Sequence, residues 1–180
     1  AGTLLPPDIV TYKWIPVSGG IGSAIGIAMA ALIPMTKMPE RIALSHAFGG
    51  LAAALVGVCH YYLHGADHLS HFTMGALGFE VLFGGLTFTG SLMAFGKLQG
   101  LISSRNITYP MQNASNIGLF AATVAILVYI TVNPDAAFFF YLMLLVAFGL
   151  GVLIVLPIGG ADMPVVITLL NSYAGLAASA

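Results

Sequence analysis

The sequence predicts an all-α fold, a polytopic bundle of about six transmembrane helices. The first reason is composition: 59% of the 180 residues are hydrophobic, 6% are charged, and the mean hydropathy is +1.00. Soluble domains carry about 25% charged residues, so this chain has too few to cover a surface that faces water. The second reason is length, because the apolar runs last for roughly 20 residues, which as a helix cross about 30 Å of hydrocarbon. The short alternating runs of a membrane barrel are not seen.

The first three helices are expected at residues 15–35, 39–63 and 72–96. The second begins at Pro39, where a proline in the first turn loses no hydrogen bond that the helix needs. The link after the third helix, residues 97–113, is long and mildly amphipathic, so we expect it to rest at the membrane interface.

The last three helices are expected at residues 115–132, 136–158 and 162–180. The Asn-Pro-Asp sequence at 133–135 favours a short turn between the first two of them. Gly159 and Gly160 end the next helix, and Asp162 is a suitable N-cap for the last one.

Residues 1–180 are expected to form a single transmembrane domain. The sequence lacks an initiator methionine and stops at Ala180 within an apolar stretch. We therefore expect the chain to be a fragment of a larger membrane subunit.

Composition and motifs also exclude some functions. The net charge of −1 provides no basic surface for a nucleic-acid partner. The sequence contains neither a P-loop nor a glycine-rich dinucleotide motif between a strand and a helix. We therefore expect no nucleotide cofactor to be bound by this chain.

The basic residues predict the orientation of the helices. Lys37 and Arg41 surround the link before the second helix, and Lys97 and Arg105 lie after the third. Four of the five basic residues thus fall on one side, which the positive-inside rule assigns to the cytoplasm or to a mitochondrial matrix. By alternation, Asp162 also lies on the basic side.

Polar groups inside membrane helices are costly, so they are functional candidates. His46, Glu80, Asp162 and Asn171 stand out. His46 and Asn171 enter from the basic side and lie about 10 Å and about 13 Å along their helices. A histidine beside an amide could relay protons, although a histidine that only packs is about as plausible. Glu80 lies about two turns into its helix from the opposite side, where it could line a water-filled path or stay protonated in apolar surroundings. A carboxyl group that only lies at the interface is about as plausible.

A second group of histidines lies between the second and third helices. His60, His64 and His68 are spaced by four residues, and His71 follows. Such a group can bind a metal, but a solvated helix end is the preferred interpretation, and no metal site is expected. His46 and His60 have a spacing also seen in helices that bind two haems. No second helix carries a matching pair, so an electron-transfer haem subunit ranks third among the possible functions.

Three longer strings resemble a known family. They are "MPERIALSHAFGGLAAALVG" at 38–57, "GGLTFTGSLMAFGKLQG" at 84–100 and "IGGADMPVVITLLNSYAG" at 158–175. They resemble the membrane domain of proton-translocating NAD(P) transhydrogenase, in the part that its beta subunit contributes. The resemblance implies an enzyme that couples hydride transfer between NADH and NADP⁺ to proton movement across the membrane. This chain would be its proton channel.

The resemblance also assigns roles to residues. His46 is similar to the family's candidate proton carrier, Asn171 to its polar partner, and Asp162 to the residue that faces the NADP(H) domain in coupling. The secondary positions that the resemblance covers are Gly50, Gly85, Gly90 and Ser91, with Arg41 in the first string and Glu80 as a weaker transfer.

The partners implied by the resemblance are further membrane helices, the lipid bilayer, and soluble domains that hold NAD(H) and NADP(H). A dimer of the whole enzyme is expected, in a bacterial inner membrane or a mitochondrial inner membrane. The alternative function is a secondary transporter or ion channel fragment without a redox partner.

Overall fold

The computed structural model describes residues 12–32, 34–64 and 70–179. Its internal contacts divide the chain into two compact units, Ala1–Lys37 and Met38–Ala180, and each is described by itself. The first unit contains α1 (Trp14–Leu32) and the short 3-10 turn η2 (Met35–Lys37). No residue of α1 is buried.

The second unit contains five membrane-length helices. In chain order its elements are α2 (Met38–His64), α3 (His71–Leu98), α4 (Gln112–Val132), α5 (Ala137–Val155), the 3-10 turn η4 (Gly160–Asp162) and α6 (Met163–Ser179). With α1, six helices in the described residues are long and apolar enough to cross a membrane. The predicted all-α fold with six transmembrane helices is confirmed.

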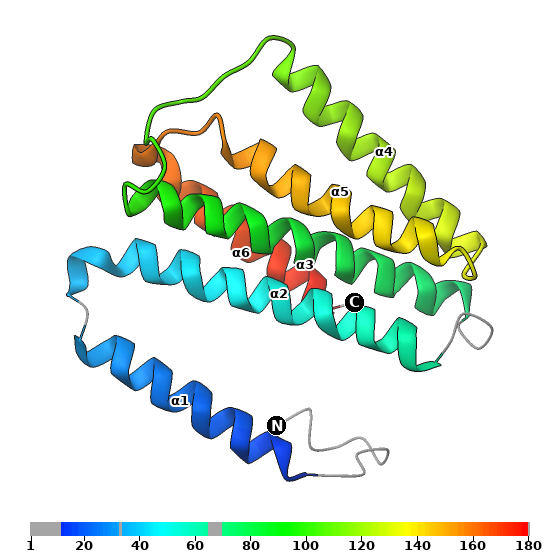
Figure 1. Cartoon of the computed structure of the whole chain (residues 1–180), viewed down its shortest axis with the longest axis horizontal. Helices are drawn as coiled ribbons and strands as arrows, with labels where there is room; N and C mark the ends of the chain where they lie inside the picture. The colour runs from blue at the N-terminus through cyan, green and yellow to red at the C-terminus, as the bar shows by residue number, and fades with distance from the viewer. Residues whose placement is uncertain (1–11, 33, 65–69, 180) are drawn as a thin grey trace. The chain divides into compact units, whose positions relative to one another are not determined.

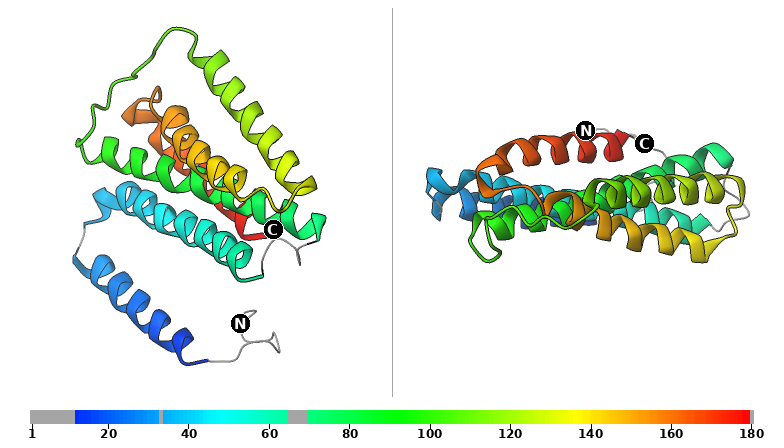
Figure 2. Two further views of the ribbon diagram at one scale, coloured as in Figure 1. Left: turned by 45° about the vertical axis from the view of Figure 1, so that its right-hand side comes forward. Right: turned by 90° about the horizontal axis from the view of Figure 1, so that it is seen from above.

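The central element of the second unit is α3, which packs against α2, α4, α5 and α6 (Figure 1). Further contacts join α2 to α6 and α4 to α5. Figure 2 shows α6 crossing one face of the pair formed by α2 and α3. The buried side chains form two clusters. One lies mainly among α3, α5 and α6 and comprises Ala43, Leu86, Ala94, Leu150, Val155, Met163, Val166, Ile167 and Leu170. The other lies among α2, α3, α4 and α5 and comprises Tyr61, Met74, Val81, Leu82, Ile130, Phe140 and Met143.

Small residues let α2 and α3 approach closely. A Cβ atom added to Gly50 would lie 2.8 Å from the carbonyl oxygen of Gly84, and a Cβ on Gly84 would lie 2.8 Å from the backbone nitrogen of Ala54. Lipid offers no hydrophobic force between apolar helices, so close backbone packing has to supply the attraction. Ala43, Ala47 and Ala54 are buried along the same helix.

The helix ends follow the predicted ones within a few residues. Pro39 is the second residue of α2, in the first turn as expected. At the start of α3, the hydroxyl of Ser70 accepts a hydrogen bond from the backbone N–H of Thr73 at 3.1 Å, which caps the helix. The largest differences in this unit are three residues each: α4 begins at Gln112 and not at Ser115, and α5 ends at Val155 and not at Ile158. Beyond this end of α5, the carbonyl groups of Val155, Leu156 and Ile158 face Lys97 of α3.

Candidate functional site

Two of the predicted site residues line one cleft between α2 and α6. His46 of α2 and Asn171 of α6 both border a cavity of about 330 Å³. Its remaining lining residues are Pro39, Ile42, Pro164, Ile167 and Thr168. They recur at helical spacing on both elements, so the cleft follows one face of each helix.

The local sequence explains why His46 and Asn171 lie at the same depth. Each helix starts at the same end of the unit and has a proline as its second residue. His46 follows the first residue of α2 by eight positions, and Asn171 follows the first residue of α6 by eight positions. At 1.5 Å per residue, both side chains lie about 12 Å along their helices.

The cleft combines an imidazole and an amide in an otherwise mostly apolar wall. His46 is half-buried, and Asn171 is exposed. An imidazole gains and loses a proton near neutral pH, and an amide can both donate and accept a hydrogen bond. The hydroxyl of Thr168 is already used, because it donates to the carbonyl oxygen of Val165 at 2.7 Å.

Ser91 lies on the face of α3 that meets α2, level with His46. Two contacts between the antiparallel helices α2 and α3 give their register: Gly50 packs against Thr87, and Gly57 packs against Glu80. Each contact residue on one helix is seven residues from the other contact residue on the same helix. Four residues further along each helix bring His46 level with Ser91. The hydroxyl groups of Ser91 and Thr87 are fully buried, and neither has a hydrogen-bond partner among the described residues. Buried hydroxyl groups without a protein partner are typical sites for a bound water.

Glu80 is remote from the cleft. A Cβ atom on Gly57 would lie 3.4 Å from Oε2 of Glu80, which places this carboxyl group against α2. Gly57 follows His46 by eleven residues, so the two levels are about 16 Å apart along the helix. The structure therefore places Glu80 nearer the opposite end of the α2–α3 interface.

Asp162 and Arg41 lie near the starts of α6 and α2 and do not line the cleft. Asp162 is exposed and is the last residue of η4, which continues directly into α6. Arg41 is half-buried in the first turn of α2, and its Nη1 lies 3.7 Å from the sulfur of Met38. At this end Gln99, just after α3, donates to the carboxylate of Glu40 in α2, so the start of α2 lies beside the end of α3.

The predicted glycines lie at contacts between helices and do not line the cleft. Gly50 lies between α2 and α3. Gly85 faces Phe148 of α5, and Gly90 faces Leu170 of α6.

Some features of these contacts were not identified from sequence. They are the packing of Gly84 against Gly50 and of Gly151 against Gly90, the position of Thr87, and the burial of Lys97. Glycine is common in membrane helices, so a glycine that packs cannot be told from a neighbour that does not.

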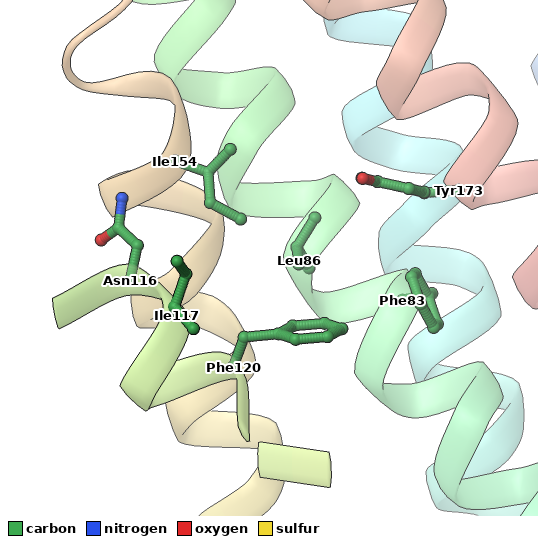
Figure 3. Close-up of a pocket in the computed structure, with 7 residues that line it drawn as sticks. All are labelled: Phe83, Leu86, Asn116, Ile117, Phe120, Ile154 and Tyr173. Carbon is green, nitrogen blue, oxygen red and sulfur yellow. The ribbon is translucent and has the colours of Figure 1, made fainter. Parts of the chain in front are cut away.

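A second cavity of about 390 Å³ lies among α3, α4, α5 and α6 (Figure 3). Phe83, Leu86, Ile117, Phe120, Ile154 and Tyr173 make it mostly apolar. Its amide, Asn116, accepts a hydrogen bond from the Tyr109 hydroxyl at 3.0 Å and donates to the carbonyl oxygen of Leu153 at 3.4 Å. The polar group here is thus used to join α4 to α5.

The histidines between α2 and α3 lie in different surroundings. His71 Nδ1 is 2.7 Å from the carbonyl oxygen of Thr131 in α4. His60 is half-buried in α2. The side chain of His64 and the whole of His68 lie outside the described residues. Within the described part, no group of three or more potential metal ligands occurs.

Comparison with known proteins gives one family. The family model described as NAD(P) transhydrogenase beta subunit matches residues 3–180. The chain is 43% identical over 185 aligned residues to NAD(P) transhydrogenase subunit beta of Rhodospirillum rubrum, covering 98% of this chain and 39% of that protein. The same protein from a specified strain of that species gives the same values. The chain thus spans about two fifths of the length of these relatives, and with six long apolar helices among its described residues it is an integral membrane protein.

Proposed function

We propose that this chain, which belongs to the NAD(P) transhydrogenase beta subunit family, carries protons through the membrane part of a proton-translocating NAD(P) transhydrogenase. The observation that carries the proposal is the cleft in which His46 and Asn171 lie at the same depth on two different helices. A titratable imidazole beside an amide, open along an apolar wall, fits transient proton binding.

The proton path runs along two interfaces. A proton enters near Glu80 and follows the α2–α3 interface, where the buried hydroxyl groups of Thr87 and Ser91 hold water. It binds to His46 and leaves along the α2–α6 cleft, past Asn171 toward Asp162. The direction can reverse, because each step is a proton transfer between groups that both gain and lose it.

Coupling follows from the position of Asp162 at the start of α6. Protonation of His46 changes the charge in the α2–α6 cleft, and a shift of α6 moves Asp162 at its end. Asp162 faces a partner domain that binds NADP(H), and a second partner domain binds NAD(H). Hydride transfer takes place in those domains, and this chain holds and moves only the proton. By linkage, the redox state of the bound nucleotide must shift the proton affinity of His46 by the same free energy.

The assembly and orientation follow from the same proposal. The chain works with further helices of the membrane domain, in a dimer of the whole enzyme. Asp162 and the basic links face the cytoplasm in a bacterial inner membrane, or the matrix in a mitochondrial inner membrane.

The test uses the full-length enzyme in liposomes. Reduction of an NADP⁺ analogue by NADH and the internal pH are followed together for wild type, His46→Ala and His60→Ala. His60 is the matched control, since it is a histidine of the same helix that does not line the cleft. His46→Ala should lose both signals by about a hundredfold or more, the usual range for a lost proton-transfer group, while His60→Ala keeps them.

The possible outcomes separate the hypotheses. Normal proton-coupled turnover in His46→Ala would show that His46 is not the proton carrier. Hydride transfer that continues without any pH change would place His46 on the proton path but outside the hydride step. No hydride transfer in the wild-type enzyme would instead favour a transporter or channel without a redox partner.

A further inference from the structure

Lys97 is the one charged side chain that is fully buried in the part of the chain that the structure describes, with 1% of its surface exposed. It lies in the last turn of α3, at the end of the unit where α5 also ends. A buried charge is costly unless it has well-placed partners, so the position of this ammonium group requires an explanation.

The partners of Lys97 are backbone carbonyl groups at the end of α5 and in the turn that follows it. Its Nζ donates to the carbonyl oxygens of Leu156 at 2.5 Å and Ile158 at 2.7 Å, and that of Val155 lies 3.5 Å away. Carbonyl groups at the end of a helix have no partner within it and carry the negative end of its dipole. An ammonium group has three donors, so a single lysine can satisfy all three oxygens.

The same contacts extend to the turn before α6. The backbone carbonyl of Lys97 accepts a hydrogen bond from the Ser104 hydroxyl at 3.0 Å. The carbonyl oxygen of Ser104 accepts one from the backbone N–H of Gly160 at 3.0 Å. Gly160 begins η4, and Asp162 ends it. The end of α3, the end of α5 and the start of α6 are thus joined in one hydrogen-bonded group.

The lysine does more than fill space. An apolar side chain of similar length would avoid burying a charge, but it would leave the carbonyl oxygens of Leu156 and Ile158 without this donor. The ammonium group adds directionality, because it holds three specified oxygens in one arrangement. The helix end that it holds leads within a few residues to the exposed carboxylate of Asp162.

We infer that Lys97 is a positioning residue for the coupling step, which fixes the turn between α5 and α6 to the end of α3. It thereby sets the position of Asp162 and of the α6 face that carries Asn171 relative to His46. This inference rests on the proposed function of the cleft. Lys97 touches neither the proton nor a nucleotide, and acts only through the turn.

The test compares Lys97→Met with Lys37→Met in the full-length enzyme in liposomes. Lys37 is an exposed lysine directly before α2, so it controls for loss of a positive charge. In Lys97→Met, kcat for coupled reduction of the NADP⁺ analogue should fall about 10²-fold with KM unchanged, since displacement of a group by about 1 Å has that effect. Lys37→Met should keep the wild-type kcat.

A second measurement reports the turn itself. A nitroxide label is placed at Ala161→Cys, next to Asp162, or at the exposed Ala122→Cys of α4, each with Cys59→Ser and no other reactive cysteine. In Lys97→Met, the label at 161 should become mobile while the label at 122 keeps its wild-type spectrum. Equal loosening at both positions would overturn the inference, because it would show a general structural role.

Wild-type kcat and an immobile label at 161 in Lys97→Met would also overturn it. If Lys97→Met does not fold, Gly160→Val tests the same turn with the ammonium group retained. A Cβ on Gly160 would lie 3.0 Å from Cβ of Ser104, so valine displaces the turn, and the same loss of kcat is expected. A wild-type kcat in that variant would count against the inference. An active His46→Ala enzyme would instead refute the proposed function, so the two failures are distinguishable.

Discussion

Gly50 lies where α2 packs directly against α3, and its replacement by alanine tests the close packing of the bundle. The added Cβ would lie 2.8 Å from the carbonyl oxygen of Gly84 and 2.9 Å from the backbone nitrogen of Phe88. Both are backbone atoms and cannot rotate away. The adjacent Gly49 is the matched control, because a Cβ there meets nothing within 4 Å.

The size of the effect follows from these distances. A carbon–oxygen contact is ordinarily about 3.3–3.6 Å, so the Gly50→Ala helices must separate by roughly 0.5–0.8 Å. Overpacking of this kind costs about 1–3 kcal/mol. Gly49→Ala should instead stabilise the helix by about 0.5–1 kcal/mol, because alanine loses less conformational entropy than glycine. The free energies of unfolding of the two variants should therefore differ by about 1.5–4 kcal/mol.

The assay is equilibrium unfolding in mixed micelles with increasing SDS, followed by circular dichroism. Coupled turnover in liposomes provides a second readout, since His46 lies one turn before Gly50 and shifts with α2. Gly50→Ala should be less stable than wild type and slower in turnover. Equal stability of the Gly50→Ala and Gly49→Ala variants would refute the close approach of α2 and α3.

Two further pairs of substitutions can be measured in the same unfolding assay. Gly151→Ala should destabilise by about 1–3 kcal/mol, because its Cβ would meet backbone atoms of α3, whereas Gly149→Ala, with nothing within 4 Å, should not. Equal effects would contradict the packing of α5 on α3. Thr89→Val removes a hydrogen bond to the carbonyl oxygen of Phe148 at 2.8 Å and should cost about 0.6 kcal/mol, typical of such bonds in membranes. Thr87→Val removes a buried hydroxyl group that bonds to no described protein group. It should cost no more than Thr89→Val, because only a bond to water is lost, and a larger loss would show that Thr87 has a protein partner.

The membrane helices and their approximate ends were predictable from sequence. In lipid each helix must satisfy its own backbone hydrogen bonds, so an apolar run of sufficient length has almost no other structure available. Pro39 likewise indicated the start of α2. His46 and Asn171 were identified as candidates because polar groups are costly in lipid, and counting along each helix predicted their similar depth. Their roles in proton transfer stay predictions.

The choice of neighbours was decided only by the tertiary structure. The helices are apolar on all sides, so the pattern that identifies the inner face of a soluble helix is missing. Gly49 and Gly50 are the same residue type in succession, yet only Gly50 meets another helix. Lys37 and Lys97 are both basic residues at helix ends, yet Lys97 is buried against three carbonyl groups at and just beyond the end of α5. Hydropathy specifies that a segment enters the membrane, whereas packing between backbones specifies which of its faces meets which neighbour.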